Sequence, residues 1–230
     1  MHLDLYVVTD EGISEGRSHA EIAHLAVEGG ADAIQLRDKV CGNRDLLKTG
    51  REISWITRKA GVLFIVNDRL DVAIACGADG VHLGQDDIRV DTARQLAPPG
   101  FIIGVSVGSV EEAEDAVKNG ADYVAVSPVF DTRSKDDAGP GHGLYLIRAI
   151  RNRSHIPVVA IGGIDESNVR DVIAAGADGI AVISAVVGKP DIPKATRDLK
   201  DVIRRSKHSI GNIERRRKVT KKTAVIDDNL

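Results

Sequence analysis

The chain has 230 residues, with 31 basic and 34 acidic side chains, a formal net charge of −3 and 43% hydrophobic residues, which is ordinary for a globular protein. No apolar run approaches the ~18 residues of a membrane helix, and the N-terminus lacks a basic region followed by a long apolar stretch, so we expect neither a membrane span nor a secretory signal. Cys41 and Cys76 are the only cysteines. They exclude a disulfide framework and a zinc ribbon, and they fit a reducing cytoplasm.

Four copies of a Gly-Ala-Asp phrase divide the chain. They stand at 30–32, 77–79, 120–122 and 176–178, each after a helical pattern and before an aliphatic run. The glycine suits a left-handed helix stop, and the Ala-Asp pair leads the chain back into a strand. The spacings of 47, 43 and 56 residues fit two strand–helix units each rather than a solenoid repeat.

Aliphatic runs predict eight strands, at 3–9, 33–37, 63–67, 80–83, 102–106, 123–127, 158–161 and 179–184. Amphipathic stretches predict eight helices, at 18–29, 43–60, 69–76, 89–96, 109–119, 143–152, 165–175 and 191–204. The alternation indicates a single (β/α)8 TIM barrel of the α/β class. A doubly wound open sheet is the alternative, because periodicity does not prove closure. Asn67-Asp68 and Asp165 are candidate N-terminal caps of the third and seventh helices.

The C-terminal segment differs in charge from the rest. Residues 204–230 hold nine basic and three acidic residues, whereas 1–203 carry a net charge of −9. The apolar periodicity also stops there. We therefore expect a catalytic domain over 1–204 and a flexible basic tail over 205–230.

Polar residues follow several predicted strands, where a βα barrel carries its active site. Gln35, Arg37 and Lys39 alternate at the end of the second strand and should share one side. Long polar side chains pointing into a barrel are costly without a ligand or counter-charges. The other strand ends contribute Asn67, Asp68, His82, Asp87, Ser106, Gly162, Gly163, Ile183 and Ser184.

These residue types suggest two kinds of site on one rim. Gly162-Gly163 would let backbone amides approach an anion closely, and the ends of strands seven and eight are the usual phosphate site of this architecture. Asp68 and Asp87 offer hard oxygen ligands for Mg²⁺. Simpler readings exist, since the glycines could form a tight turn and Asp68 could cap a helix. The joint placement carries more weight, and it suggests a metal-held diphosphate beside a second phosphate.

The sequence resembles the thiamine-phosphate synthase family over essentially all of residues 3–190. The motifs that carry the resemblance are 35–39 (QLRDK), 66–68 (VND), 81–87 (VHLGQDD), 104–106 (GVS), 128–135, 160–164 (AIGGI) and 182–185 (VISA). The resemblance implies a TIM barrel that joins 4-amino-2-methyl-5-(diphosphooxymethyl)pyrimidine to a thiazole phosphate. The products would be thiamine phosphate and pyrophosphate. It also implies one Mg²⁺ per active site, held by Asp68 and Asp87.

The resemblance further assigns substrate contacts by position. Those to the pyrimidine diphosphate would be Gln35, Arg37, Lys39, Asn67, Ser106 and Lys135, with Arg37, Lys39, Ser106 and Lys135 acting in catalysis. Those to the thiazole phosphate would be Thr132, Ser134, Gly163, Ile183 and Ser184. The chain departs from the family at Asp131, where Pro is usual, and at Ser134, where Thr is usual.

We expect small-molecule substrates to be the partners and the protein to work in the cytoplasm. We expect no binding to membranes or to specific nucleic acids, and the chain could form a homo-oligomer.

Three other functions remain as alternatives. A thiazole tautomerase shares the barrel but generally lacks the diphosphate and metal residues and carries a His where this chain has Pro128. A sugar-phosphate isomerase would need a catalytic Glu at a strand end, which is not evident. A sensor or nucleic-acid-binding protein would act through the tail, which lacks aromatic residues for stacking.

Overall fold

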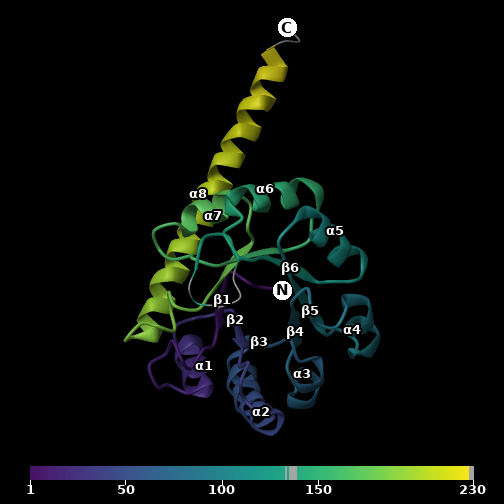
Figure 1. Cartoon of the computed structure of the whole chain (residues 1–230). Coiled ribbons are helices and arrows are strands. Elements are labelled where there is room, and N and C mark those ends of the chain that lie inside the picture. Colours follow the sequence, from purple (N-terminus) through teal and green to yellow (C-terminus); the bar gives the residue numbers. More distant parts are fainter. Residues whose placement is uncertain (133, 135–138, 228–230) are drawn as a thin grey trace.

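A computed structural model describes residues 1–132, 134 and 139–227, with side chains described as far as residue 211. Eight parallel strands form a closed barrel in chain order, with β8 paired to β1 (Figure 1). The predicted TIM barrel is confirmed, and the open-sheet alternative is wrong, because an open sheet would leave β1 and β8 unpaired. The strands are β1 (Leu5–Val8), β2 (Ala33–Leu36), β3 (Leu63–Asn67), β4 (Gly80–Leu83), β5 (Ile102–Val107), β6 (Tyr123–Val126), β7 (Val158–Ile161) and β8 (Gly179–Val182).

Helices surround the barrel and cover the outer face of the strands (Figure 1). They are α1 (His19–Glu28), α2 (Asn43–Ala60), α3 (Leu70–Cys76), α4 (Val90–Leu96), α5 (Val110–Lys118), α6 (Gly143–Arg153), α7 (Val169–Ala174) and α8 (Ile192–Asp227). Most strands are buried at every position, as runs covered on both faces should be. Aliphatic side chains dominate this core, in keeping with an aromatic content of 3%.

The four aspartates of the repeated phrase all make the same kind of hydrogen bond. Each precedes an even-numbered strand and accepts a hydrogen bond from the backbone N–H at or near the start of the preceding strand. The pairs are Asp32 with Leu5 (2.9 Å), Asp79 with Phe64 (2.8 Å), Asp122 with Ile103 (2.7 Å) and Asp178 with Val158 (2.8 Å). The four glycines of the phrase have positive φ values of 92°, 72°, 95° and 110° in chain order, which confirms the predicted left-handed stops. The repeat therefore links neighbouring strands at the N-terminal end of the barrel.

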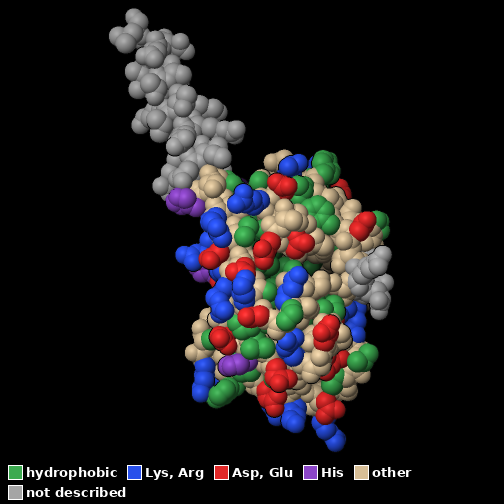
Figure 2. All heavy atoms as spheres, turned by 90° about the vertical axis from the view of Figure 1, so that its left-hand side faces the viewer, with side chains coloured by type: hydrophobic (Ala, Val, Ile, Leu, Met, Phe, Trp, Pro, Cys, Tyr) green, Lys and Arg blue, Asp and Glu red, His purple; other side chains and the backbone are tan. Residues whose placement is uncertain are grey.

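Helix α8 does not end near residue 204 as expected but continues to Asp227, and its C-terminal part extends beyond the barrel (Figure 1). Lys200 and Lys207 attach it to the barrel by ion pairs with Asp32 and Asp4, the second at 2.7 Å. Figure 2 shows that basic and acidic side chains are mixed on the face that carries α1 and α8. The division at residue 204 stays a prediction. None of the described helices is both long and apolar enough to cross a membrane.

The two predicted helix caps are wrong. The N-cap position of α3 is Arg69, and Asp68 just before it has a left-handed backbone with φ 62°. Helix α7 begins at Val169, later than expected, with Asn168 at its N-cap position. Asp165 instead accepts a hydrogen bond from the Ser167 N–H at 2.8 Å, which forms a turn before the helix.

The aspartate links give a direct stability prediction. Asp32→Ala removes the acceptor of the buried Leu5 N–H and the partner of Lys200. We expect the free energy of unfolding to fall by about 2 kcal/mol, because a buried donor is left without a partner. Urea titration followed by circular dichroism measures the change. Asp198→Ala on exposed α8 surface is the matched control and should cost less than about 0.5 kcal/mol. Equal losses in the two variants would contradict the account.

Candidate active site

Two cavities open side by side at the C-terminal ends of the strands. One, of about 320 Å³, we call the charged half; it is lined by Arg37, Lys39, Asn67, Asp68, His82, Gly84, Gln85, Asp86, Asp87, Ser106 and Gly139. The other, of about 290 Å³, we call the glycine half; it is lined by Thr132, Ser134, Ile161–Asp165, Ala181–Ala185 and Lys189. Ser127 and Pro128 line both cavities. The predicted rim residues therefore fall into two adjoining compartments with one shared wall.

Arg37 and Lys39 line the charged half, but Gln35 does not. Gln35 is 3% exposed and donates from Nε2 to the Tyr6 hydroxyl at 2.7 Å, below the cavity. Arg37 is held by Asp10, whose Oδ2 accepts from the guanidinium at 3.3 Å. Sequence reasoning missed Asp10, although it comes directly after the first strand and the strand-end rule would have found it.

Asp68 and Asp87 lie close together on the charged half. Burial, and next the charge of Asp87, raise the pKa of Asp68 from 3.8 to about 6, against the opposing charges of Lys39 and Arg37. Backbone contacts fix both residues. The Asp68 N–H donates to the His82 carbonyl at 2.8 Å, and the Asp87 Oδ2 accepts from the Gly84 N–H at 2.7 Å. The two carboxylates thus repel each other at a site where a cation would relieve the repulsion.

The residues present fit a magnesium ion that takes most of its ligands from substrate phosphates and water. Across the described part of the chain, no group of three or more His, Cys, Asp or Glu side chains is placed to hold a metal. Mg²⁺ commonly uses one or two carboxylates together with substrate phosphates and water. Asp68 and Asp87 match that pattern, whereas a closed all-protein cage is not formed by the described residues.

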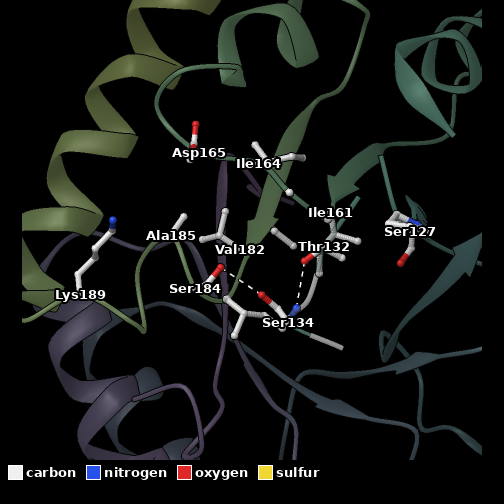
Figure 3. Close-up of a pocket in the computed structure, with 15 residues that line it drawn as sticks. Ser127, Thr132, Ser134, Ile161, Ile164, Asp165, Val182, Ser184, Ala185 and Lys189 are labelled. Atoms are coloured by element: carbon white, nitrogen blue, oxygen red, sulfur yellow. Dashed lines mark hydrogen bonds between the residues drawn. The ribbon is translucent and has the colours of Figure 1, made fainter. Parts of the chain in front are cut away.

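The glycine half combines a tight glycine turn with hydroxyl groups. Gly163 has φ 63°, and a Cβ there would lie 2.7 Å from the Asp131 carbonyl oxygen. Ser134 Oγ donates to Ser184 Oγ at 3.1 Å, and its N–H donates to Thr132 Oγ1 at 3.2 Å (Figure 3). These contacts bring the β6–α6 loop against the end of β8.

Backbone donors in the glycine half remain available for an anion. In the described portion of the molecule, the N–H groups of Gly163, Ser184 and Ala185 find no acceptor. Lys189 also lines this cavity, near enough to Asp165 for its charge to help lower the pKa of that carboxyl, after the hydrogen bonds from Ser167 (Figure 3). Convergent amides next to hydroxyls form an anion-binding site. Lys189 was missed by the strand-end rule because it comes after the loop that follows β8.

Two features of the β6–α6 loop bear on the departures from the family pattern. The Asp131 carboxylate accepts a hydrogen bond from the Gly141 N–H at 2.9 Å, so it connects the two ends of the loop. Ser134 keeps a hydroxyl in the cavity. Lys135, a predicted site residue, lies outside the described residues.

Comparison with known proteins identifies the family. A family model described as thiamine monophosphate synthase matches residues 5–186. The chain belongs to this family. It is 68% identical over 207 residues to a thiamine-phosphate synthase of Methanoregula boonei, covering 90% of this chain and 96% of the relative. It is 62% identical over 207 residues to the one of Methanoculleus marisnigri, covering 90% of this chain and 98% of the relative.

Comparison with solved structures leads to the same family, thiamine monophosphate synthase. A thiamine phosphate pyrophosphorylase from Pyrococcus furiosus superposes with a TM-score of 0.82 at 45% identity, covering 89% of this chain and 96% of that chain. A 3-hexulose-6-phosphate synthase superposes with a TM-score of 0.63 at 18% identity, covering 86% of this chain and 99% of that chain. The second likeness shows the barrel fold alone.

The raised pKa of Asp68 predicts how stability depends on pH. The folded pKa of about 6 exceeds the ordinary 3.8, so the folded protein binds the Asp68 proton more tightly than the unfolded chain does. The contribution of this proton to the free energy of unfolding is complete below pH 3.8 and is lost as pH rises through 6. Asp68→Asn replaces the carboxyl with an amide that does not ionise, so this loss of stability does not occur. Asparagine also adopts the left-handed backbone of this position readily. Without divalent metal we expect it to raise the free energy of unfolding at pH 7.5 by roughly 1 kcal/mol, allowing for solvent screening.

The same comparison at low pH is the control. The difference between Asp68→Asn and the unsubstituted protein should shrink steadily toward pH 4, as chemical denaturation at a series of pH values would measure. A difference that stayed constant from pH 4 to pH 7.5 would contradict repulsion at this carboxylate.

Proposed function

We propose that the chain condenses 4-amino-2-methyl-5-(diphosphooxymethyl)pyrimidine with a thiazole phosphate, giving thiamine phosphate and pyrophosphate. The single observation that carries the proposal is the pair of cavities sharing the Ser127–Pro128 wall. One cavity combines cations with a carboxylate pair, and the other combines glycine amides with hydroxyls. Two anionic substrates bound in these compartments would meet at the shared wall.

The charged half would bind the pyrimidine diphosphate. Arg37 and Lys39 supply positive charge to its oxygens, with Asp10 keeping the guanidinium in place. Asn67 and Ser106 add polar groups to the same cavity. Asp68 and Asp87 would hold Mg²⁺, which when bound supplies charge neutralisation to a diphosphate leaving group. The resemblance adds Lys135 to this set, whereas Gln35, which it also assigns, lies outside this cavity and donates its amide hydrogen to Tyr6.

The glycine half would bind the thiazole phosphate. Amides of Gly163 and of the Ile183-Ser184 segment, with the hydroxyls of Thr132 and Ser134, would fix the phosphate and so aim the ring nitrogen at the shared wall. The carbon–oxygen bond to pyrophosphate breaks, and its electron pair leaves with the pyrophosphate oxygen. The aminopyrimidine then bears the positive charge. The thiazole nitrogen then forms the new carbon–nitrogen bond. The step needs no protein nucleophile, so the chain's part is positioning, electrostatics and exclusion of water.

A mixing assay tests the proposal. Purified protein, both substrates and Mg²⁺ should yield thiamine phosphate and pyrophosphate in equal amounts, measured by chromatography. A thiazole tautomerase or a thiamine-phosphate sensor would produce neither, and that result would overturn the proposal. Cytoplasmic location and oligomeric state stay predictions.

Loss of a metal ligand should be costly. Asp87→Ala removes half of the carboxylate pair, and we expect kcat/KM for the pyrimidine diphosphate to fall roughly 100-fold. EDTA should abolish turnover of the unsubstituted protein, and added Mg²⁺ should restore it. Asp91→Ala, on the exposed first turn of α4, is the control and should behave like the parent. Full turnover in EDTA would reject the metal role.

The phosphate cradle can be tested at one glycine. In Gly163→Ala the new Cβ would press on the Asp131 carbonyl, and a left-handed backbone is strained for alanine. We expect the KM for the thiazole phosphate to rise about tenfold or more while the KM for the pyrimidine diphosphate hardly changes. Gly42→Ala, where a Cβ meets nothing within 4 Å, is the control. Equal increases in both KM values would refute the division between the two cavities.

A further inference from the structure

A chain of hydrogen-bonded side chains crosses the interior of the barrel beneath the charged half. Gln35 Nε2 donates to the Tyr6 hydroxyl at 2.7 Å, and the Tyr6 and Tyr123 hydroxyls lie 3.3 Å apart. The Tyr123 hydroxyl lies 2.9 Å from His82 Nδ1, and His82 Nε2 lies 2.9 Å from Ser106 Oγ. Five different strands contribute these residues, and only the last two line the cavity.

The middle of this chain is sealed from water. Tyr6 and Tyr123 are 1% and 0% exposed. The Tyr123 side chain packs against Gly104, where a Cβ would come within 2.4 Å of two ring carbons and the hydroxyl oxygen. Its ring also stacks on His82 with centroids 5.5 Å apart. Burial raises the pKa of both phenols far above the ordinary value, so each keeps its proton. Each hydroxyl must therefore place one proton on a neighbour.

The amide nitrogen of Gln35 sets the direction of all these hydrogen bonds. An amide N–H₂ group only donates, so the Tyr6 oxygen accepts, and the Tyr6 proton must go to Tyr123. The Tyr123 proton then goes to His82 Nδ1, which leaves the histidine proton on Nε2, facing Ser106. In the opposite direction the Tyr6 proton would have no acceptor among the described residues, because the other partner of its hydroxyl is the donating Gln35 amide. Consistent with this order, no buried side-chain nitrogen or oxygen among the described residues lacks a partner.

We propose that Tyr6 and Tyr123 are positioning residues that hold His82 as its Nε2–H tautomer and thereby turn the Ser106 hydroxyl proton outward into the charged half. Ser106 Oγ accepts from His82, so its own proton is directed at an oxygen of the bound anion. Resting on the proposed function, that oxygen belongs to the diphosphate of the pyrimidine substrate. The hydroxyl then meets the leaving group already oriented as a donor, with no reorientation during the reaction.

The first test is spectroscopic and needs no turnover. Protein labelled with ¹⁵N-histidine should show His82 as a neutral imidazole protonated on Nε2, with its signals assigned by their loss in His82→Gln. Tyr123→Phe removes the donor to Nδ1, and we expect the His82 signals to change toward a mixture of tautomers. A parent protein with the His82 proton on Nδ1 would overturn the proposal, because the chain would then run from Ser106 to Gln35.

The second test is kinetic. Tyr123→Phe should lower kcat/KM for the pyrimidine diphosphate about tenfold and leave the KM for the thiazole phosphate unchanged. In a Ser106→Ala background the same substitution should have no further effect, since the hydroxyl that it orients is gone. An equal loss in both backgrounds would show a merely structural role and reject the proposal. Tyr145→Phe, on an exposed residue of α6, is the matched control.

Two provisions keep the tests decisive. If Tyr123→Phe does not fold, Tyr6→Phe interrupts the same chain one bond earlier and should alter the His82 signals in the same direction. If the protein forms no thiamine phosphate, the proposed function fails, yet the tautomer of His82 in the parent protein still decides whether the chain has the direction inferred here.

Discussion

The hydrogen bond from an N–H at or near the start of one strand to the aspartate just before the next strand is the constraint from which the architecture follows. Four such bonds repeat around the N-terminal end of the barrel, at every second strand. They align strands of only four to six residues, which have few ladder bonds of their own to define register. With one end aligned, the polar residues at the other end of each strand meet at a common level. The active-site rim is thus organised from the opposite end of the barrel.

With the proposed function, the rim has to bind anions beside two carboxylates. In the protein alone, burial and next the charge of Asp87 raise the pKa of Asp68. Arg37 and Lys39 oppose it, and a divalent cation would reverse it by drawing carboxylates and phosphate oxygens to one centre. The glycine half solves the same problem differently, with neutral amide and hydroxyl donors. This difference explains how one rim could separate a metal-bound diphosphate from a simple phosphate ester.

The sequence was informative where local pattern and tertiary structure agree. Aliphatic runs placed the strands closely, and the strand-end rule brought Arg37, Asp68, Asp87 and Ser106 to one cavity. It failed where geometry depends on neighbours. Asp68 looked like a helix cap, but its backbone is left-handed. Gln35 shares its strand side with Arg37 and Lys39, yet it lies deeper and its amide donates a hydrogen bond to the Tyr6 hydroxyl.

Some features had no local signal at all. Tyr6 and Tyr123 are 117 residues apart, and nothing in either strand predicts that their hydroxyls meet. Beyond residue 204, α8 contacts the barrel through Lys207, whose partners Asp4 and Asp178 come from the two ends of the barrel sequence. Such contacts follow from closure, which apolar periodicity cannot encode.

The most direct test of the central claim is a crystal structure with thiamine phosphate, pyrophosphate and Mn²⁺ bound. We expect a Mn²⁺ anomalous peak between Asp68 and Asp87, pyrophosphate against Arg37 and Ser106, and the phosphate of thiamine phosphate against Gly163 and Ser184. Both phosphate groups in one cavity, or a metal peak away from the two aspartates, would contradict it.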